Sequence, residues 1–152
     1  MGRQRVGRRQ LETIQSGLTH RDLKIVETLA DHRFLTTRQI CRFCYTDKRS
    51  ATAALRSANR TLVKLRDLRL LVSLDRRVGG VRAGSGSYVW GLGLIGARLL
   101  EQVHQPDEHC KRYREYEPST TFLKHSLAVA EVSLRIFEAT RARRFAMVAI
   151  EY

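Results

Sequence analysis

The sequence has no long hydrophobic run and few cysteines, and each lack narrows the class of protein. No apolar segment approaches the roughly 20 residues that a helix needs to cross a bilayer. The N-terminal segment, MGRQRVGRRQ, has arginines but no apolar stretch behind them, so we expect no secretory signal. Three cysteines, an odd number, do not suggest a disulfide framework. We therefore expect a protein of the reducing cytosol with free thiols.

Charge is abundant and unevenly distributed. The 152 residues, 43% of them hydrophobic, suffice for one domain with a buried core, and the net charge is +13. Residues 1–92 hold 19 basic and 7 acidic residues, whereas residues 93–152 hold 9 and 8. A positive field concentrated in one half of a chain favours a polyanionic partner. Nucleic acid is the better candidate than a membrane surface, because the basic segment is followed by a hairpin and not by a bare aromatic face.

Two helices are predicted in the first third of the chain. The first covers Thr19 to about Asp31, where apolar residues recur at helical spacing and Thr19 with Asp22 forms a plausible N-terminal cap. The second is TTRQICRFCY, capped by Thr36 or Thr37, with an inward side formed by Ile40, Phe43 and Cys44. The N-terminal residues 1–17 are expected to form a basic flexible arm.

The segment from Lys48 to Leu92 is the most informative part of the sequence. A basic amphipathic stretch, KRSATAALRSANRTLVKLRDL, is capped by Asp47 or Ser50, and its predicted core stripe is Leu55, Ala58, Leu62 and Leu65. Short apolar strands over 70–74 and 88–92 flank a tip rich in glycine and arginine. The order of helix, strand, basic hairpin and strand predicts a winged helix-turn-helix domain over residues 18–103. Such a domain places its third helix in the major groove of DNA.

This plan assigns DNA contacts to three groups of residues. The outward face of the third helix supplies base or near-base contacts from Thr52, Arg56, Asn59 and Arg60. Its start and flank supply backbone contacts from Lys48, Arg49, Ser50 and Lys64. At the hairpin tip, Arg76, Arg77 and Arg82 are expected to follow the adjacent DNA backbone or the minor groove. A solvated basic face on a winged helix that binds protein is the alternative.

The C-terminal part is predicted to contain a fourth helix over 94–103, a linker over 104–118, and a segment over 119–152. This last segment comprises a long helix from about Ser119 to Arg141 and a short apolar strand, FAMVAI. One apolar stripe of the long helix is Leu123, Leu127, Ala130, Leu134 and Phe137. A second stripe, opposite to it, is His125, Val129, Val132 and Ile136. A helix with two apolar sides is buried on both, so we expect the second stripe to form a homodimer interface. The predicted fold class is therefore mainly α with a small β-hairpin wing, followed by a C-terminal dimerisation segment.

Two motifs suggest other chemistry. Gly91, Gly93 and Gly96 match the dinucleotide fingerprint, but no second parallel strand follows, so we expect no cofactor. Cys41 and Cys44, with His109-Cys110, have the composition of a metal site. We expect the two helical cysteines to be buried apolar residues instead, so that a metal or redox sensor is an alternative function.

A nicking enzyme is a further alternative, with Tyr113 or Tyr116 as the nucleophile. The sequence has no His-x-His, no phosphate-binding loop and no acidic metal pair, so we expect a protein that is not an enzyme.

Four segments taken in order resemble the replication-relaxation family of Gram-positive plasmids and integrated elements. They are LTHRDLKIVETLADHRFLTTRQICRF, LVKLRDLRLLVSL, YVWGLGLIGARLL and FLKHSLAVAEVSLRIFEA. The resemblance covers about Leu18 to Ala139. It implies a DNA-binding protein of a plasmid or mobile element, acting in replication, DNA relaxation or transfer, or their control. It also implies a location in the bacterial cytoplasm, in association with the nucleoid or a plasmid. An autonomous transcriptional repressor is the alternative. Arg69 stands where the family often has glycine, so we expect this turn to differ.

The predicted DNA contacts of the hairpin tip can be tested by substitution. Replacing Arg76, Arg77 or Arg82 with alanine is expected to weaken binding to all DNA sequences by a similar factor, because phosphates carry no sequence information. The slope of log affinity against log salt should fall by about 0.9 for each phosphate that the variant no longer neutralises. Fluorescence anisotropy at several salt concentrations measures both effects, and an unchanged slope in all three variants would contradict the assignment.

Overall fold

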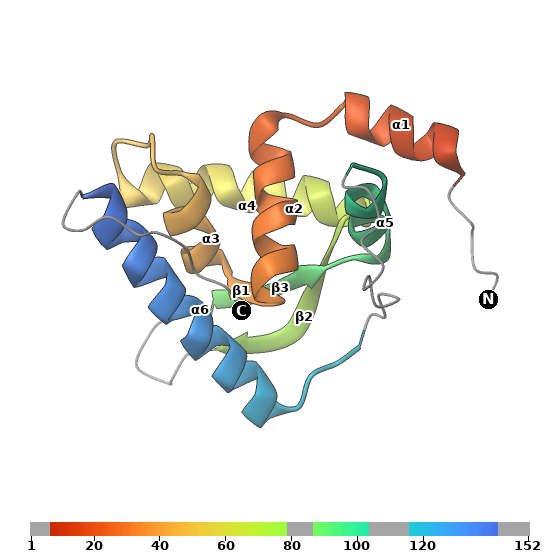
Figure 1. Cartoon of the computed structure of the whole chain (residues 1–152). Helices are drawn as coiled ribbons and strands as arrows, with labels where there is room; N and C mark the ends of the chain where they lie inside the picture. The colour runs from red at the N-terminus through yellow and green to blue at the C-terminus, as the bar shows by residue number, and fades with distance from the viewer. Residues whose placement is uncertain (1–6, 79–86, 104–115, 143–152) are drawn as a thin grey trace.

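The computed structural model describes residues 7–78, 87–103 and 116–142 and confirms a mainly α protein with a small β-sheet (Figure 1). Its elements, in chain order, are α1 (Arg8–Ser16), α2 (His20–His32), β1 (Phe34–Thr36), α3 (Thr37–Cys44), α4 (Ala51–Asp67), β2 (Leu71–Val78), β3 (Ser87–Leu92), α5 (Leu94–Val103) and α6 (Thr120–Arg141). None of the helices in the described ranges has the length and apolar composition to span a membrane.

Side-chain caps fix where the three helices of the winged domain begin. Thr19 and Asp22 form a reciprocal capping box at the start of α2, as predicted. Thr36, and not Thr37, caps α3 in the same way with Gln39. Ser50, and not Asp47, caps α4 by accepting a hydrogen bond from the N–H of Ala53. These caps satisfy N–H groups that the first turn of a helix otherwise leaves without partners.

The sheet is antiparallel with the strand order β1-β3-β2. The two hairpin strands are longer than predicted, and β1 was not predicted because three residues are too few to show alternation. In β1 and β3, Leu35 pairs with Trp90 and both belong to the main core on the side of the helices. Phe34 and Val89 lie on the other face, in a smaller cluster with residues of α6.

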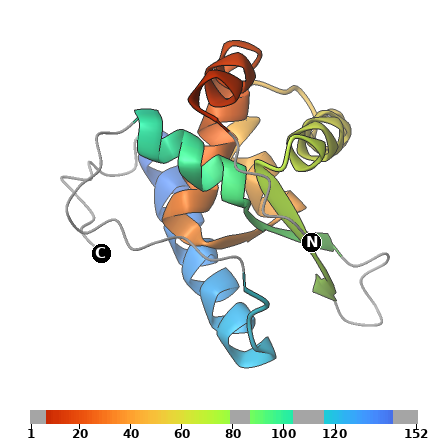
Figure 2. The same cartoon turned by 90° about the vertical axis from the view of Figure 1, so that its right-hand side faces the viewer.

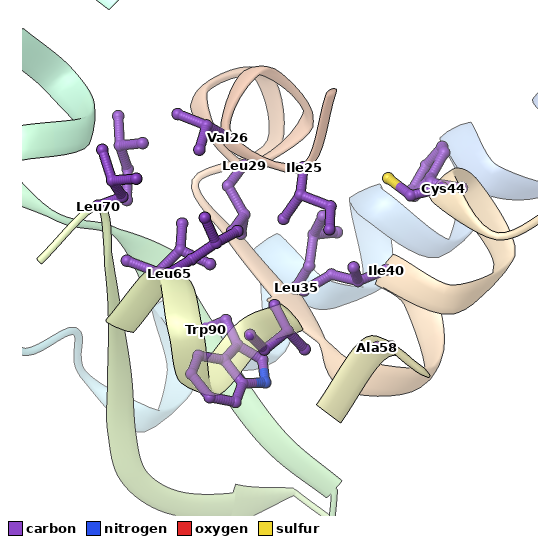
Figure 3. Close-up of a cluster of buried hydrophobic side chains, with 14 of the residues drawn as sticks. Ile25, Val26, Leu29, Leu35, Ile40, Cys44, Ala58, Leu65, Leu70 and Trp90 are labelled. Carbon is purple, nitrogen blue, oxygen red and sulfur yellow. The ribbon is translucent and has the colours of Figure 1, made fainter. Parts of the chain in front are cut away.

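The main core lies between α2, α3, α4 and the sheet, as Figure 3 shows for ten labelled side chains from Ile25 to Trp90. α4 buries Ala54, Ala58, Leu62 and Leu65. Three of the four predicted core residues of this helix are therefore confirmed. The prediction of Leu55 is wrong, because the helix turns Ala54 inward and leaves Leu55 only partly buried at the edge of the stripe.

The prediction of a flexible arm over residues 1–17 is wrong for Arg8–Ser16, which form α1. Leu11 is buried, and Ile14 and Leu18 pack against the same core. Their spacing of three and four residues gives the segment an apolar side in spite of its arginines. α1 contacts α5, at the end of the molecule away from α6 (Figures 1 and 2).

α6 begins one residue after Ser119, which caps it, and packs on α3 and β1. Arg42 of α3 clamps it: the guanidinium donates two hydrogen bonds to Glu138, at 2.8 and 2.7 Å, and one to Glu131, at 2.8 Å. The buried Gln39 side chain adds a hydrogen bond to the carbonyl of Leu127. The long helix is therefore docked on the winged domain. The predicted strand FAMVAI and most of the predicted linker over 104–118 lie outside the described residues.

The end of α4 forms a Schellman motif. The N–H of Arg69 donates to the carbonyl of Arg66 at 2.8 Å, and the N–H of Leu70 donates to the carbonyl of Leu65 at 2.9 Å. Arg69 adopts a φ of 58°, the left-handed conformation that glycine usually supplies. The expectation that arginine would change this turn is wrong. The two hydrogen bonds hold the turn even though the conformation costs an L-residue roughly 1–2 kcal/mol.

The backbone that leaves this turn passes closely under the start of α5. The N–H of Gly93 donates to the carbonyl of Leu70 at 2.8 Å. A Cβ atom on Gly93 would lie 2.5 Å from the carbonyl oxygen of Arg69, and one on Gly96 would overlap the carbonyl oxygen of Leu70. Two glycines of the fingerprint-like motif are thus required by backbone packing.

Replacing Gly96 with alanine tests this crossing. We expect a loss of about 1–3 kcal/mol in the free energy of unfolding, because the methyl group meets a backbone carbonyl that cannot move away freely. Urea denaturation measures it. Gly17→Ala is the control, since its Cβ would lie 3.5 Å from the nearest atom at an ordinary φ of −90°. Its effect should stay within about 0.5 kcal/mol, and equal midpoints for the two variants would refute the steric explanation.

Candidate nucleic-acid interface

α4 presents a continuous polar face on the side opposite its buried stripe. Successive residues of a helix are rotated by about 100°, so Arg56 and Arg60 point away from Ala54, Ala58 and Leu65. Thr52 and Asn59 flank the two arginines on one side, and all four predicted base-contact residues are exposed. One face of α4 thus packs into the core, and the opposite face presents exposed hydrogen-bonding groups.

Val63 lies on the same face, one turn after Asn59, and is 42% exposed. Sequence reasoning did not single it out, because an isolated valine in an amphipathic helix is ordinarily assigned to the core. Its position beside polar residues at spacings of four and three is the signal that could have identified it. An exposed aliphatic group there can contact a thymine methyl group.

The residues predicted to hold the DNA backbone differ in their surroundings. Lys48 and Arg49 are exposed in the turn before α4. Ser50 is exposed as well, but its hydroxyl already caps the helix. Lys64 contacts Asp22 of α2, with 2.8 Å between the ammonium nitrogen and the carboxylate oxygen. The structure therefore gives Lys64 a role in joining two helices, which the sequence did not suggest.

Asp22 is the buried partner of that pair, with 4% of its side chain exposed. Burial alone would raise its pKa, but the hydrogen bonds from Lys64 and from the Thr19 N–H and hydroxyl outweigh burial and hold the pKa below its usual value. The carboxylate is therefore charged at neutral pH and fixes Lys64 beside the N-terminus of α2.

The hairpin consists of β2 and β3, two of the three strands of the sheet, and lies below α4 in Figure 2. Arg76 and Arg77 belong to β2, and Arg77 pairs with Tyr88 of β3 after an irregularity in register that follows Leu74. Of the two arginines only the backbone is described, and Arg82 lies outside the described residues. The three predicted tip contacts thus remain predictions.

A buried hydrogen-bond pair fixes α3 against the hairpin. The indole N–H of Trp90 donates to the hydroxyl of Thr37 at 2.9 Å, and Thr37, the first residue of α3, donates to the carbonyl of Tyr88 at 3.5 Å. Because α3 also packs on α4, this link holds the outward face of α4 in a set orientation to the hairpin.

Cys41 and Cys44, considered above as metal ligands, belong to the hydrophobic core: Cys44 is buried in it and Cys41 packs against it. Burial, together with the neighbouring Cys44, raises the pKa of Cys41 to about 11, and burial also raises the pKa of Cys44. Both are therefore thiols at neutral pH. Among the described residues no three metal-binding side chains converge; His109 and Cys110 lie outside them. Tyr116 packs against Phe34 and Phe122, and Tyr113 lies outside the described residues.

The two predicted stripes of α6 lie on opposite sides of the helix. Leu123, Leu127, Ala130 and Leu134 are buried against the sheet and α3. Of the predicted dimer residues, His125, Val129 and Val132 are exposed, the two valines by 41% and 60%, and Ile136 is partly buried. An apolar stripe thus faces outward on α6.

The comparisons with known proteins identify a family. The replication-relaxation family matches residues 26–151, a span that includes most of α2 and every later element of the fold. No curated protein and no solved structure matches the chain. With most of its length matched, the chain belongs to the replication-relaxation family.

Proposed function

We propose that the protein binds double-stranded DNA in a sequence-specific manner, with α4 as the recognition helix in the major groove. The outward face of α4, where Arg56 and Arg60 lie opposite the buried stripe, is the observation that carries the proposal. Arginine pairs with guanine through two hydrogen bonds, and asparagine at position 59 can pair with adenine. The proposal assigns the chain binding and no catalytic reaction.

The charge distribution supports the same assignment. Most of the positive excess lies in residues 1–92, which contain α4 and the hairpin. Lys48 and Arg49 stand exposed beside the start of α4, where the backbone of a duplex would pass if that end of the helix entered the groove. These exposed cations thus lie beside the recognition helix, on the side from which DNA would approach.

Membership of the family indicates a role in the replication or relaxation of plasmid or mobile-element DNA. We propose that the protein acts there by binding an origin or transfer site in the bacterial cytoplasm. A transcriptional repressor needs the same groove contacts, so the position of the bound site decides between the two. Footprinting on the native element should show repeated sites at an origin, whereas protection of a promoter would favour the repressor.

The role of Arg56 is tested with two variants on a DNA site selected from a random pool. Arg56→Ala is expected to cost about 1–3 kcal/mol of binding free energy, as for the removal of a bidentate hydrogen bond to a base. Arg56→Lys keeps the charge but not the planar fork, so it should retain non-specific binding and lose the preference for the selected site. Anisotropy titrations with selected and scrambled duplexes measure both affinities.

Lys124→Ala on α6 is the matched control, because it removes an exposed cation from another helix. If Arg56→Ala and Arg60→Ala bind the selected duplex as the wild type does, α4 is not the recognition helix.

We propose that the partner of the outer stripe of α6 is a second copy of the chain. A two-fold axis across this stripe would bring Val129 and Val132 of one copy against the same residues of the other, so each apolar patch covers its equivalent. The stripe faces away from the clamp to α3, and dimerisation therefore needs no rearrangement of the winged domain.

Val132→Asp tests the dimer. A carboxylate in the centre of the stripe is expected to convert a dimer to a monomer in sedimentation equilibrium, because an apolar interface cannot solvate it. Val103→Asp on α5 is the control, since Val103 is similarly exposed, at 41%. A wild-type protein that is monomeric at high micromolar concentration, or a Val132→Asp variant that still dimerises, would rule out this interface.

A further inference from the structure

A cavity of about 670 Å³ lies between the N-terminal half of α2, the turn from α3 to α4, and the middle of α4. We call it the α2–α4 pocket. Its volume falls within the range of about 300–1,000 Å³ that is typical of small-molecule sites. The proposed contacts with DNA use the outer face of α4, whereas the pocket lies on the flank that faces α2, where Ser57 and Thr61 also point. The pocket thus lies mainly on another side of α4 than the DNA-binding face, and it overlaps the predicted DNA contacts at Arg60 and Lys64.

The pocket has an excess of positive charge. Two carboxylates in its wall are each bound to a cation: Asp22 to Lys64 at 2.8 Å, and Asp47 to Arg21 at 2.7 Å. Lys24 and Arg60 also line it, and no carboxylate of the described residues forms a salt bridge with either of them. The ammonium of Lys24 also lies over the ring of Phe137, 6.0 Å from its centre. The two cations favour an anion.

Tyr45 forms part of the pocket wall and is 4% exposed. Its hydroxyl is buried and has no hydrogen-bond partner among the described residues, a condition that folded proteins seldom leave uncorrected. Burial raises the pKa of Tyr45, and the nearby Thr61 side chain opposes that shift without reaching full hydrogen-bond geometry with the hydroxyl. The guanidinium of Arg21 lies 4.7 Å from the centre of the tyrosine ring and holds the ring in place. The hydroxyl itself has almost no accessible surface, so Tyr45 contributes a wall to the pocket and not a donor at its surface.

We propose that the α2–α4 pocket binds a small molecule that carries a phosphate group. A phosphate dianion matches the charges of Lys24 and Arg60, neither of which is paired with a carboxylate of the described residues, and its acceptor oxygens suit both cations.

Arg60 connects this pocket with DNA binding. It lines the pocket and also stands on the outward face of α4. A bound phosphate would hold the Arg60 side chain toward α2 and place negative charge near the phosphates of a duplex, so the ligand antagonises DNA binding. This regulatory step rests on the proposed function, whereas binding of the ligand does not.

Ligand binding is tested without DNA, by titrating ¹⁵N-labelled protein with inorganic phosphate, adenosine 5′-monophosphate or adenosine. We expect saturable shifts of the amide signals of residues 19–24 and 57–64 with the two phosphate probes and none with adenosine. Lys24→Met should raise the dissociation constant about tenfold, as for the removal of one charge-assisted hydrogen bond.

Lys124→Met is the control for charge, as an exposed lysine on α6. The assignment is overturned if neither phosphate probe gives saturable shifts at millimolar concentration, or if Lys24→Met binds as tightly as the wild type.

The regulatory step is tested on the selected duplex. Adenosine 5′-monophosphate should weaken DNA binding by the wild type but not by Lys24→Met, and Lys24→Met alone should leave the affinity for DNA unchanged. If Lys24→Met itself weakens DNA binding and the free phosphate probes do not bind, the pocket holds a backbone phosphate of DNA, and the small-molecule assignment is wrong. A wild type that binds the phosphate probe but no duplex would refute the proposed function and leave the pocket assignment standing.

Discussion

The backbone crossing at Leu70 is the constraint on which the arrangement of the winged domain depends. At this point α4 ends, β2 begins, and the chain returns from β3 into α5 through Gly93, whose N–H donates to the Leu70 carbonyl. The absence of a side chain at Gly96 lets α5 lie directly on that carbonyl. The crossing also retains the costly left-handed conformation of Arg69, because a different turn would move β2 away from β3 or lift α5 from the core. The direction of the hairpin relative to α4 is thus set where the helix stops.

Much of the fold could be predicted because local patterns and tertiary structure agree. The caps at Thr19 and Ser50, the inward residues of α3, and the buried stripe of α6 all follow from spacing that needs no knowledge of the partner element. β1 could not be predicted, because only its pairing with β3 makes three residues a strand. α1 was missed since its charged and polar residues outnumber its apolar ones, and only the contacts with the core and with α5 show that it is ordered.

The candidate site was predictable to a lesser degree, since charge alone does not show which cations are free. Arg56 and Lys64 have the same sign and lie on the same helix, yet the exposed Arg56 stands on the outward face while Lys64 binds a buried carboxylate. The difference arises from Asp22, 42 positions away in the sequence, and no periodicity reveals such a partner. Arg42 is a similar case, because its carboxylates come from α6.

The ion pairs and hydrogen bonds of α3 also connect the two outer surfaces of the molecule, the outward face of α4 and the outer stripe of α6. α3 contacts α4 on one side and holds α6 on the other through Arg42 and Gln39. The hydrogen bond between Trp90 and Thr37 ties the first turn of α3 to β3. α3 therefore connects α6, which carries the outer stripe, with α4 and the hairpin. In the proposed dimer, a second copy bound at α6 would set the distance between the two copies of α4, and the residues proposed for dimerisation would differ from those proposed for DNA contacts.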